Sequence, residues 1–171
     1  MRSIHLCANV PTTDVGLVFK QVTDFARYPS VSPDVRLAEV QPTNNGPQQT
    51  VWEVNFRRGI MRWIEEEEID PTRLHVDFRQ VEGDFDDFHG SWQLTPRKQG
   101  CDVRFEVTYD FGIESLAGIM DPLAERVIKR AICAVLVDIV GEVTVLDGGS
   151  ALTDLDQPSP DSGIHIGKGG R

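Results

Sequence analysis

The chain has 171 residues, of which 40% are hydrophobic and 26% charged, so we expect one globular domain with a sizeable core. Its formal net charge of −10 argues against a nucleic-acid backbone or an anionic membrane surface as partner, because both need clustered Lys and Arg. No apolar run is long enough to span a bilayer, so we expect a cytoplasmic protein without a membrane span.

Cysteine and histidine spacing indicates neither disulfides nor a metal site. Cys7, Cys101 and Cys133 are far apart and odd in number, which is typical of reduced thiols. The four histidines include no close pair of the kind that binds zinc. We therefore expect no metal and no cofactor.

The first 34 residues predict a strand and then one or two short helices. Apolar and polar residues alternate from Ile4 to Val10, as in a half-buried strand. Asp14, shortly after Pro11, supplies a helix-start signal. Two prolines between residues 26 and 34 predict a turn or a short second helix.

Residues 35 to 111 predict about six further strands in an antiparallel meander. Alternating apolar residues mark strands in 35–41, 52–56, 60–69 and 74–78, on both sides of Gly83, and in 101–111. Turn residues separate them at 44–47, 57–59 and 70–71.

Residues 112 to about 145 predict one long helix. Asp121 and Pro122 match an N-cap followed by proline at the first helical position. Leu123, Val127 and Ala131 begin an apolar stripe. The residues after Gly148 are rich in Gly, Pro, Ser and Asp, so we expect a domain over 1–146 and a disordered tail over 147–171.

This order of elements indicates an α+β fold with an internal pocket. An antiparallel sheet with one face in water needs cover on its other face, and only the long helix is large enough to supply it. Space left between the curved sheet and the helix forms a small-molecule pocket.

Five short motifs resemble the helix-grip superfamily, which includes START domains, birch-pollen-allergen-like proteins and polyketide cyclases. They are Tyr28-Pro29, Glu82-Gly-Asp-Phe85, Gly90-Ser-Trp-Gln-Leu94, Tyr109-Asp-Phe111 and Asp121-Pro122. The resemblance covers residues 1–146 and is greatest to the aromatase/cyclase and coenzyme-Q-binding branches. It implies a curved antiparallel sheet of about seven strands around a long C-terminal helix, with a deep apolar cavity and no cofactor.

The resemblance also implies a site. In the cyclases the cavity holds a poly-β-ketone chain and steers aldol closure and dehydration, and an acyl carrier protein is a candidate donor of that chain. Trp63, Arg79, Phe85 and Trp92 fall at positions that match the cyclase cavity wall. Glu67 stands where the better-known aromatases carry an arginine, so the usual catalytic set is not intact.

The run of four glutamates at 65–68 is the main candidate for acid–base chemistry. If Met61 and Trp63 face the cavity, Glu65 and Glu67 face it too, because strand side chains alternate. A carboxyl in an apolar pocket has a raised pKa and acts as an acid or base near neutral pH. The alternative is a charged strand end that is solvated on both sides.

Arg79 has two possible orientations. The apolar set Leu74, Val76 and Phe78 sends it outward, whereas the resemblance places it inward and requires a bulge near Gly83. An inward arginine would hold a carbonyl or enolate oxygen and pair with Glu67 across neighbouring strands.

Three further residues complete the candidate set. Tyr109 has a hydroxyl at a strand end and is a candidate proton donor. His89 is a candidate acid or base, with a place on the convex face as the alternative. Asp138 interrupts the helical stripe and faces either the pocket or water. The expected substrate-binding residues are Tyr28, Trp63, Glu65, Phe85, Trp92, Phe105 and Asp138.

Two functions of different classes follow. In the first, a cofactor-free cyclase or dehydratase uses Glu67 to abstract a proton between two carbonyls, Arg79 to stabilise the enolate, and Tyr109 or His89 to assist loss of water. In the second, the cavity carries a quinone, lipid or other apolar molecule without chemistry. A monomer and a homodimer both remain open.

Overall fold

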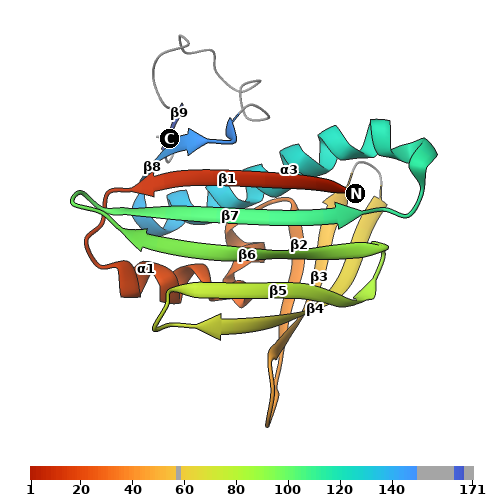
Figure 1. The fold of residues 1–171 in the computed structure, drawn as a ribbon, viewed down its shortest axis with the longest axis horizontal. Coiled ribbons are helices and arrows are strands. Elements are labelled where there is room, and N and C mark those ends of the chain that lie inside the picture. Colours follow the sequence, from red (N-terminus) through yellow and green to blue (C-terminus); the bar gives the residue numbers. More distant parts are fainter. Residues whose placement is uncertain (57–58, 150–163, 168–171) are drawn as a thin grey trace.

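One curved antiparallel sheet and one long helix form most of the protein (Figure 1). The computed structural model describes residues 1–56, 59–149 and 164–167. The strands in these residues are β1 (Arg2–Val10), β2 (Val35–Gln41), β3 (Gln48–Phe56), β4 (Gly59–Asp70), β5 (His75–Gly83), β6 (Asp87–Pro96), β7 (Cys101–Asp110), β8 (Glu142–Asp147) and β9 (Ile164–Gly167). The helices are α1 (Val15–Val22), the 3₁₀ helix η1 (Phe25–Arg27), α2 (Tyr28–Val31) and α3 (Glu114–Val140).

The meander from β2 to β7 begins at one edge of the sheet and ends beside β1. Within the described residues the order is β2-β3-β4-β5-β6-β7-β1-β8-β9, with neighbours antiparallel throughout. The sheet curls so that β2 and β3 run steeply across β5, β6 and β7, on the side of these strands where α3 also lies (Figure 1). The helix-grip architecture expected from the sequence is confirmed.

The N-terminal elements form as their local patterns predict. Ile4, Leu6 and Ala8 point into the core from β1, so the alternation in the sequence becomes the two faces of a strand. The Oδ1 atom of Asp14 accepts a hydrogen bond from the backbone N–H of Leu17 at 3.0 Å and caps α1.

The long helix differs from its prediction at both ends. α3 begins at Glu114, so Pro122 lies inside the helix and Asp121 is not its N-cap. The helix ends at Val140, because Gly141 adopts a left-handed conformation with φ of 83°. The predicted helical residues after Gly141 instead form β8, which pairs with the free edge of β1.

The C-terminal segment adds two strands that the sequence analysis did not expect. Together β8 and β9 raise the sheet from the predicted seven strands to nine in the part of the chain described here. Ile164–Gly167, which form β9, fall inside the predicted disordered tail 147–171. Residues 150–163 and 168–171 of that predicted tail lie outside the described residues.

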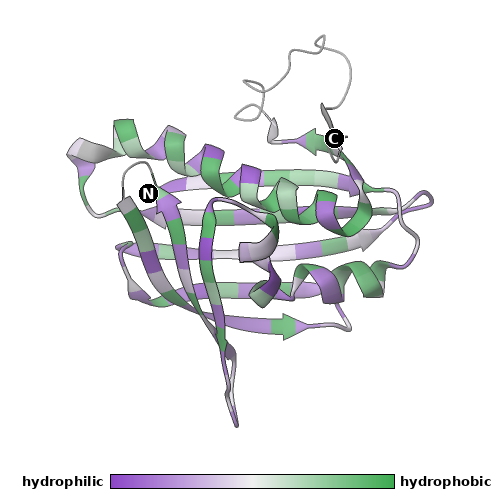
Figure 2. Ribbon diagram, turned by 180° about the vertical axis from the view of Figure 1, so that it is seen from behind, coloured by the Kyte–Doolittle hydropathy of each residue, from purple (hydrophilic) through white to green (hydrophobic). Residues whose placement is uncertain are grey.

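The core lies between the concave face of the sheet and α3. Viewed from the helix side, apolar and polar residues alternate along the strands, as a sheet with one buried face requires (Figure 2). Two ion pairs tie α3 to the segment around α2, namely Arg130 with Asp34 and Arg27 with Asp138. The side chains of the helix and the sheet leave a space between them that they do not fill completely.

Candidate functional site

A cavity of about 110 Å³ lies between α3 and the concave face of the sheet. Its helix side consists of small and aliphatic residues that include Ala124, Val127 and Ile128. The opposite side is aromatic. Its residues come from strands β3 to β7, from the β5–β6 turn, and from the short helices η1 and α2. The aromatic lining residues are Phe25, Tyr28, Trp52, Phe56, Trp63, Phe78, Phe85, Phe88, Trp92 and Phe105.

Strand register brings the aromatic walls together. Trp52 and Trp63 are directly opposite on β3 and β4, and their rings stack with centroids 6.1 Å apart. Phe85 and Phe88 lie on either side of the start of β6, and the centroids of their rings are 4.6 Å apart. Such rings present a rigid, flat surface to a ligand.

Tyr28 has its hydroxyl engaged by the protein. The ring lines the cavity, but its O–H donates a hydrogen bond to the backbone oxygen of Val22 at 2.6 Å. Burial raises the pKa of Tyr28 well above its ordinary value, with the charge of Glu65 adding to the effect. The residue therefore contributes shape to the cavity rather than a proton.

Glu65 brings an ionisable carboxyl into this apolar space. It points inward from β4 beside Trp63, whose Nε1–H donates to Glu65 Oε2 at 2.9 Å. Its side chain is buried, with 6% of the residue exposed. Met61, Trp63 and Glu65 all line the cavity, whereas Glu67, which was expected to face it with them, is not among the lining residues.

Glu67 lies on the same face of β4, beyond the apolar cavity. It is 1% exposed, and its Oε2 accepts a hydrogen bond from Gln48 Nε2 at 3.3 Å. Its Oε1 atom is buried without a hydrogen-bond partner, as are Thr50 Oγ1 and Trp52 Nε1. The Trp52 indole N–H still lies near enough to both carboxyls to lower their pKa. Glu67 therefore lies next to Glu65 on β4 but does not line the cavity.

The two carboxyls shift each other's protonation. Burial raises the pKa of Glu65 well above its ordinary range, and the nearby charge of Glu67 raises it further. Burial also raises the pKa of Glu67, to about 7, although the nearby Thr50 hydroxyl, Gln48 amide and Glu65 carboxyl act in the opposite direction. The pair therefore retains a proton at neutral pH and is able to act as acid or base.

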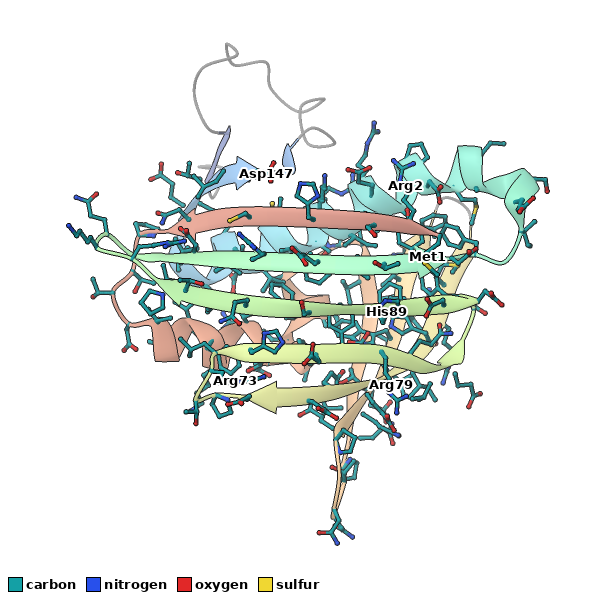
Figure 3. The ribbon with its side chains drawn as sticks, in the orientation of Figure 1. Met1, Arg2, Arg73, Arg79, His89 and Asp147 are labelled. Carbon is teal, nitrogen blue, oxygen red and sulfur yellow. The ribbon has the colours of Figure 1, made fainter. Side chains whose placement is uncertain are left out.

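Arg79 does not enter the cavity, which corrects the inward orientation that the proposed mechanism needed. Its side chain is 72% exposed and its Nη2 atom lies 2.9 Å from Glu66 Oε2 on the outer face of the sheet (Figure 3). The expected bulge is present, because the β4–β5 register shifts between Ile64 and Glu65. The bulge lies beyond Arg79, so the arginine keeps the outward direction set by Phe78.

The other predicted chemical residues are also outside the cavity. His89 lies on the outer face, half exposed, with its Nδ1 atom 3.1 Å from Asp87 Oδ1 (Figure 3). Tyr109 is fully buried in the core, and its hydroxyl donates to the backbone oxygen of Asp121 at 3.3 Å. Asp138 pairs with Arg27 at the end of α3 and does not line the cavity. None of the three is placed to touch a ligand in the cavity.

The remaining predicted wall residues do line the cavity: Trp63, Phe85, Trp92 and Phe105. Trp52, Phe78 and Phe88 also line the cavity, although the sequence pattern did not single them out as site residues. Trp52 was detectable in principle, because the predicted β3–β4 hairpin puts it opposite Trp63. The helix residues Ala124 and Ile128 carry no chemical signature, so only the packing of α3 identifies them.

The described residues hold neither a metal cluster nor a spanning helix. No group of three or more His, Cys, Asp or Glu side chains there is arranged to hold a metal ion. No helix in the same residues combines the length and hydrophobicity needed to cross a membrane.

Fold and cavity together define a helix-grip protein with a partly open aromatic pocket. The family model "Polyketide cyclase / dehydrase and lipid transport" matches residues 13–136, well over half of the chain. The protein belongs to this family. No curated protein sequence matches the chain.

Solved structures share the fold at low sequence identity. TTHA0849 from Thermus thermophilus is 23% identical with a TM-score of 0.72, over 81% of this chain and 97% of that protein. The Zhui aromatase/cyclase from Streptomyces sp. R1128 is 18% identical with a TM-score of 0.65, over 81% and 93% of the two chains. A START superfamily protein from Mycobacterium smegmatis is 15% identical with a TM-score of 0.68, over 80% and 96%.

Proposed function

We propose that this protein is a cofactor-free acid–base catalyst of the polyketide cyclase/dehydratase kind, acting on a carbonyl-bearing substrate held in the aromatic cavity. The observation that carries the proposal is the position of Glu65, a buried carboxyl at the wall of an otherwise apolar pocket. Burying an acid there costs stability, and such groups with a raised pKa concentrate at functional sites.

Glu65 takes the catalytic role that the sequence alone assigned to Glu67. As a carboxylate it accepts a proton from a carbon between two carbonyls, and the resulting enolate carbon attacks a second carbonyl carbon. As a carboxylic acid it returns that proton to the new alkoxide, which becomes a hydroxyl group. In dehydration the carboxylate takes the remaining proton from the same carbon and passes it to the departing hydroxyl, which leaves as water while a C=C bond forms. Glu67 is the positioning residue, because its charge and hydrogen bond act on Glu65 rather than on the substrate.

The pocket supplies proximity rather than polar stabilisation. Stacked rings such as Trp52 and Trp63 hold a flat, partly unsaturated chain in one register, which replaces a search over many folded conformations. Arg79, on the outer face, has no part in this mechanism.

Non-catalytic carriage of an apolar ligand, such as a quinone or a lipid, is the second candidate. It is favoured by the lining itself, since Tyr28 is the wall's other polar side chain in the described residues and its hydroxyl is already bonded to Val22. Shape and aromatic contact alone suffice for carriage.

The experiment that separates the two uses a polyketide synthase that releases an unreduced chain. Wild-type protein should change the product profile, and Glu65→Gln should slow that change by about 10²-fold, the usual contribution of a general acid or base. The matched control is Glu66→Gln, one residue away but on the outer face. An unchanged rate in Glu65→Gln would contradict catalysis, and retained ligand binding in that variant would then support carriage.

A further inference from the structure

At a pH above the pKa of about 7 of Glu67, the Glu65–Glu67 pair carries negative charge, and no cation of the described residues lines the cavity beside it. The lining contains neither Lys, Arg nor His in the described part of the chain. Lys129, which is buried on α3, is bound to Glu125, with Nζ 2.6 Å from Oε1. Arg130 on the same helix is bound to Asp34 outside the pocket.

The groups that do contact the two carboxyls are neutral. Glu65 receives the Trp63 indole N–H, and Glu67 receives the Gln48 amide. One oxygen of Glu67 and the indole nitrogen of Trp52 are buried without partners. An ionised oxygen at this place is normally paired in a folded protein, so the carboxyl pair, which meets the cavity through Glu65, lacks a positive or hydrogen-bonding partner that a ligand is able to bring.

We infer that the Glu65–Glu67 pair makes the cavity selective for the charge of its ligand, so that it accepts neutral or amine-bearing ring compounds and excludes carboxylates, fatty acids included. The inference rests on the proposed function only in requiring that the cavity holds a ligand. An ammonium group supplies the missing partner and is further favoured by the surrounding aromatic faces. A carboxylate adds a like charge in a low-dielectric site where no cation offsets it.

The size of the cavity selects the probes. An apolar cavity of about 150 Å³ holds benzene, so a space of about 110 Å³ suits one ring. A suitable series keeps the ring and changes the head group: 2-phenylethanol, 2-phenylethylamine and phenylacetate. Trp52, Trp63 and Trp92 all line the cavity and are the three tryptophans of the chain, so intrinsic fluorescence reports occupancy.

Two double variants separate local charge from net charge. Glu65→Gln with Glu67→Gln removes both inward carboxyls. Glu66→Gln with Glu68→Gln removes the same number of carboxyl groups from the same strand but from its outer face. Circular dichroism establishes that each variant is folded, and Glu65→Gln alone replaces the inward double variant if that variant does not fold.

In wild-type protein at pH 8, above the pKa of about 7 of Glu67, we expect the alcohol and the amine to bind, and phenylacetate to bind at least about tenfold more weakly than the alcohol because of the like charge. The inward variant should reduce that difference at least about fivefold, whereas the outward variant should leave it unchanged. Equal affinities for phenylacetate and the alcohol in wild type, failure of the amine alone, or an equal effect of the two double variants would each overturn the inference and leave the proposed function standing. If none of the three probes binds, the inference fails, and the product-profile experiment still decides the proposed function.

Discussion

Arg79 and Glu66 are directly opposite each other on β5 and β4, and their side chains form an ion pair of 2.9 Å on the outer face of the sheet. Because Arg79 is held in this pair on the outer face, it does not line the cavity, where the family resemblance placed it. An exposed ion pair stabilises a protein by only about 0.2–1 kcal/mol. We therefore predict that Arg79→Ala lowers the unfolding free energy by no more than that and leaves ligand affinity unchanged, measured by urea titration and tryptophan fluorescence. A loss of ligand affinity would return Arg79 to the site.

The raised pKa of Glu67 predicts a pH-dependent stability difference. Between its ordinary value of 4.5 and its folded value of about 7, the folded protein holds a proton that the unfolded chain has released. This group therefore lowers stability as the pH rises through that window. The glutamine of Glu67→Gln does not titrate. The unfolding free energy of this variant, relative to that of wild type, should therefore rise by about 2–3 kcal/mol between pH 4.5 and pH 8, measured by urea unfolding.

The control for that measurement is Glu68→Gln, which removes a charge from the adjacent outward position of β4. A gain for Glu67→Gln that is the same at both pH values would contradict the assigned burial of this carboxyl.

Close strand packing at Gly90 predicts a severe effect of a single methyl group. A Cβ atom at this position would lie 2.1 Å from the backbone oxygen of Glu106 and 2.6 Å from Phe78 Cζ. Gly90→Ala should therefore lower the unfolding free energy by about 3 kcal/mol or more. The same substitution at Gly118 of α3, where nothing lies within 4 Å, should raise it by about 0.5–1 kcal/mol. Similar effects at the two glycines would be inconsistent with this packing.

Filling the cavity from the helix side tests whether ligands bind there at all. Ala124 is buried and lines the cavity, so Ala124→Leu should occupy the space of one ring and weaken binding of 2-phenylethanol by more than about tenfold. Ala134 lies on the same helix but not on the cavity wall, so Ala134→Leu is the matched control. Isothermal titration calorimetry measures both, and equal affinities would place the ligand elsewhere.

Admission of a polyketide-sized substrate requires the cavity to open. Ligand pockets usually measure about 300–1,000 Å³, so the present volume of about 110 Å³ is too small. Arg130 holds α3 to the start of β2 through two hydrogen bonds to Asp34, of 2.6 and 2.7 Å. Asp34→Asn should weaken this bidentate pair, cost about 1–2 kcal/mol of stability and speed ligand association in stopped-flow fluorescence.

Arg97→Gln is the control for that kinetic effect, because it breaks an ion pair with Asp102 at the β6–β7 turn, away from α3. An association rate that responds equally to both substitutions would exclude Arg130–Asp34 as the restraint on opening.

Local sequence determined which face of each strand is buried. The alternation of Trp63, Glu65 and Glu67 is a property of one strand with a period of two, so their shared inward direction was predictable without knowing any neighbour. The same rule, applied to Val76 and Phe78, sends Arg79 outward, and the structure follows that pattern rather than the family resemblance. The order of a first strand, short helices, a meander and a long helix was likewise readable from periodicity and turn residues.

Tertiary structure alone decided the elements whose local signals were ambiguous or misleading. Asp121-Pro122 has the composition of a helix start, yet packing against the sheet carries α3 through it. Val143 and Val145 suit a helix or a strand, and the free edge of β1 selects the strand by offering hydrogen bonds. Glu65 lines the cavity and Glu67 lies behind it because of where α3 and the aromatic side chains bound the cavity. Sequence periodicity describes one helix or strand at a time, whereas the cavity is formed by side chains from several strands and helices that only the tertiary structure brings together.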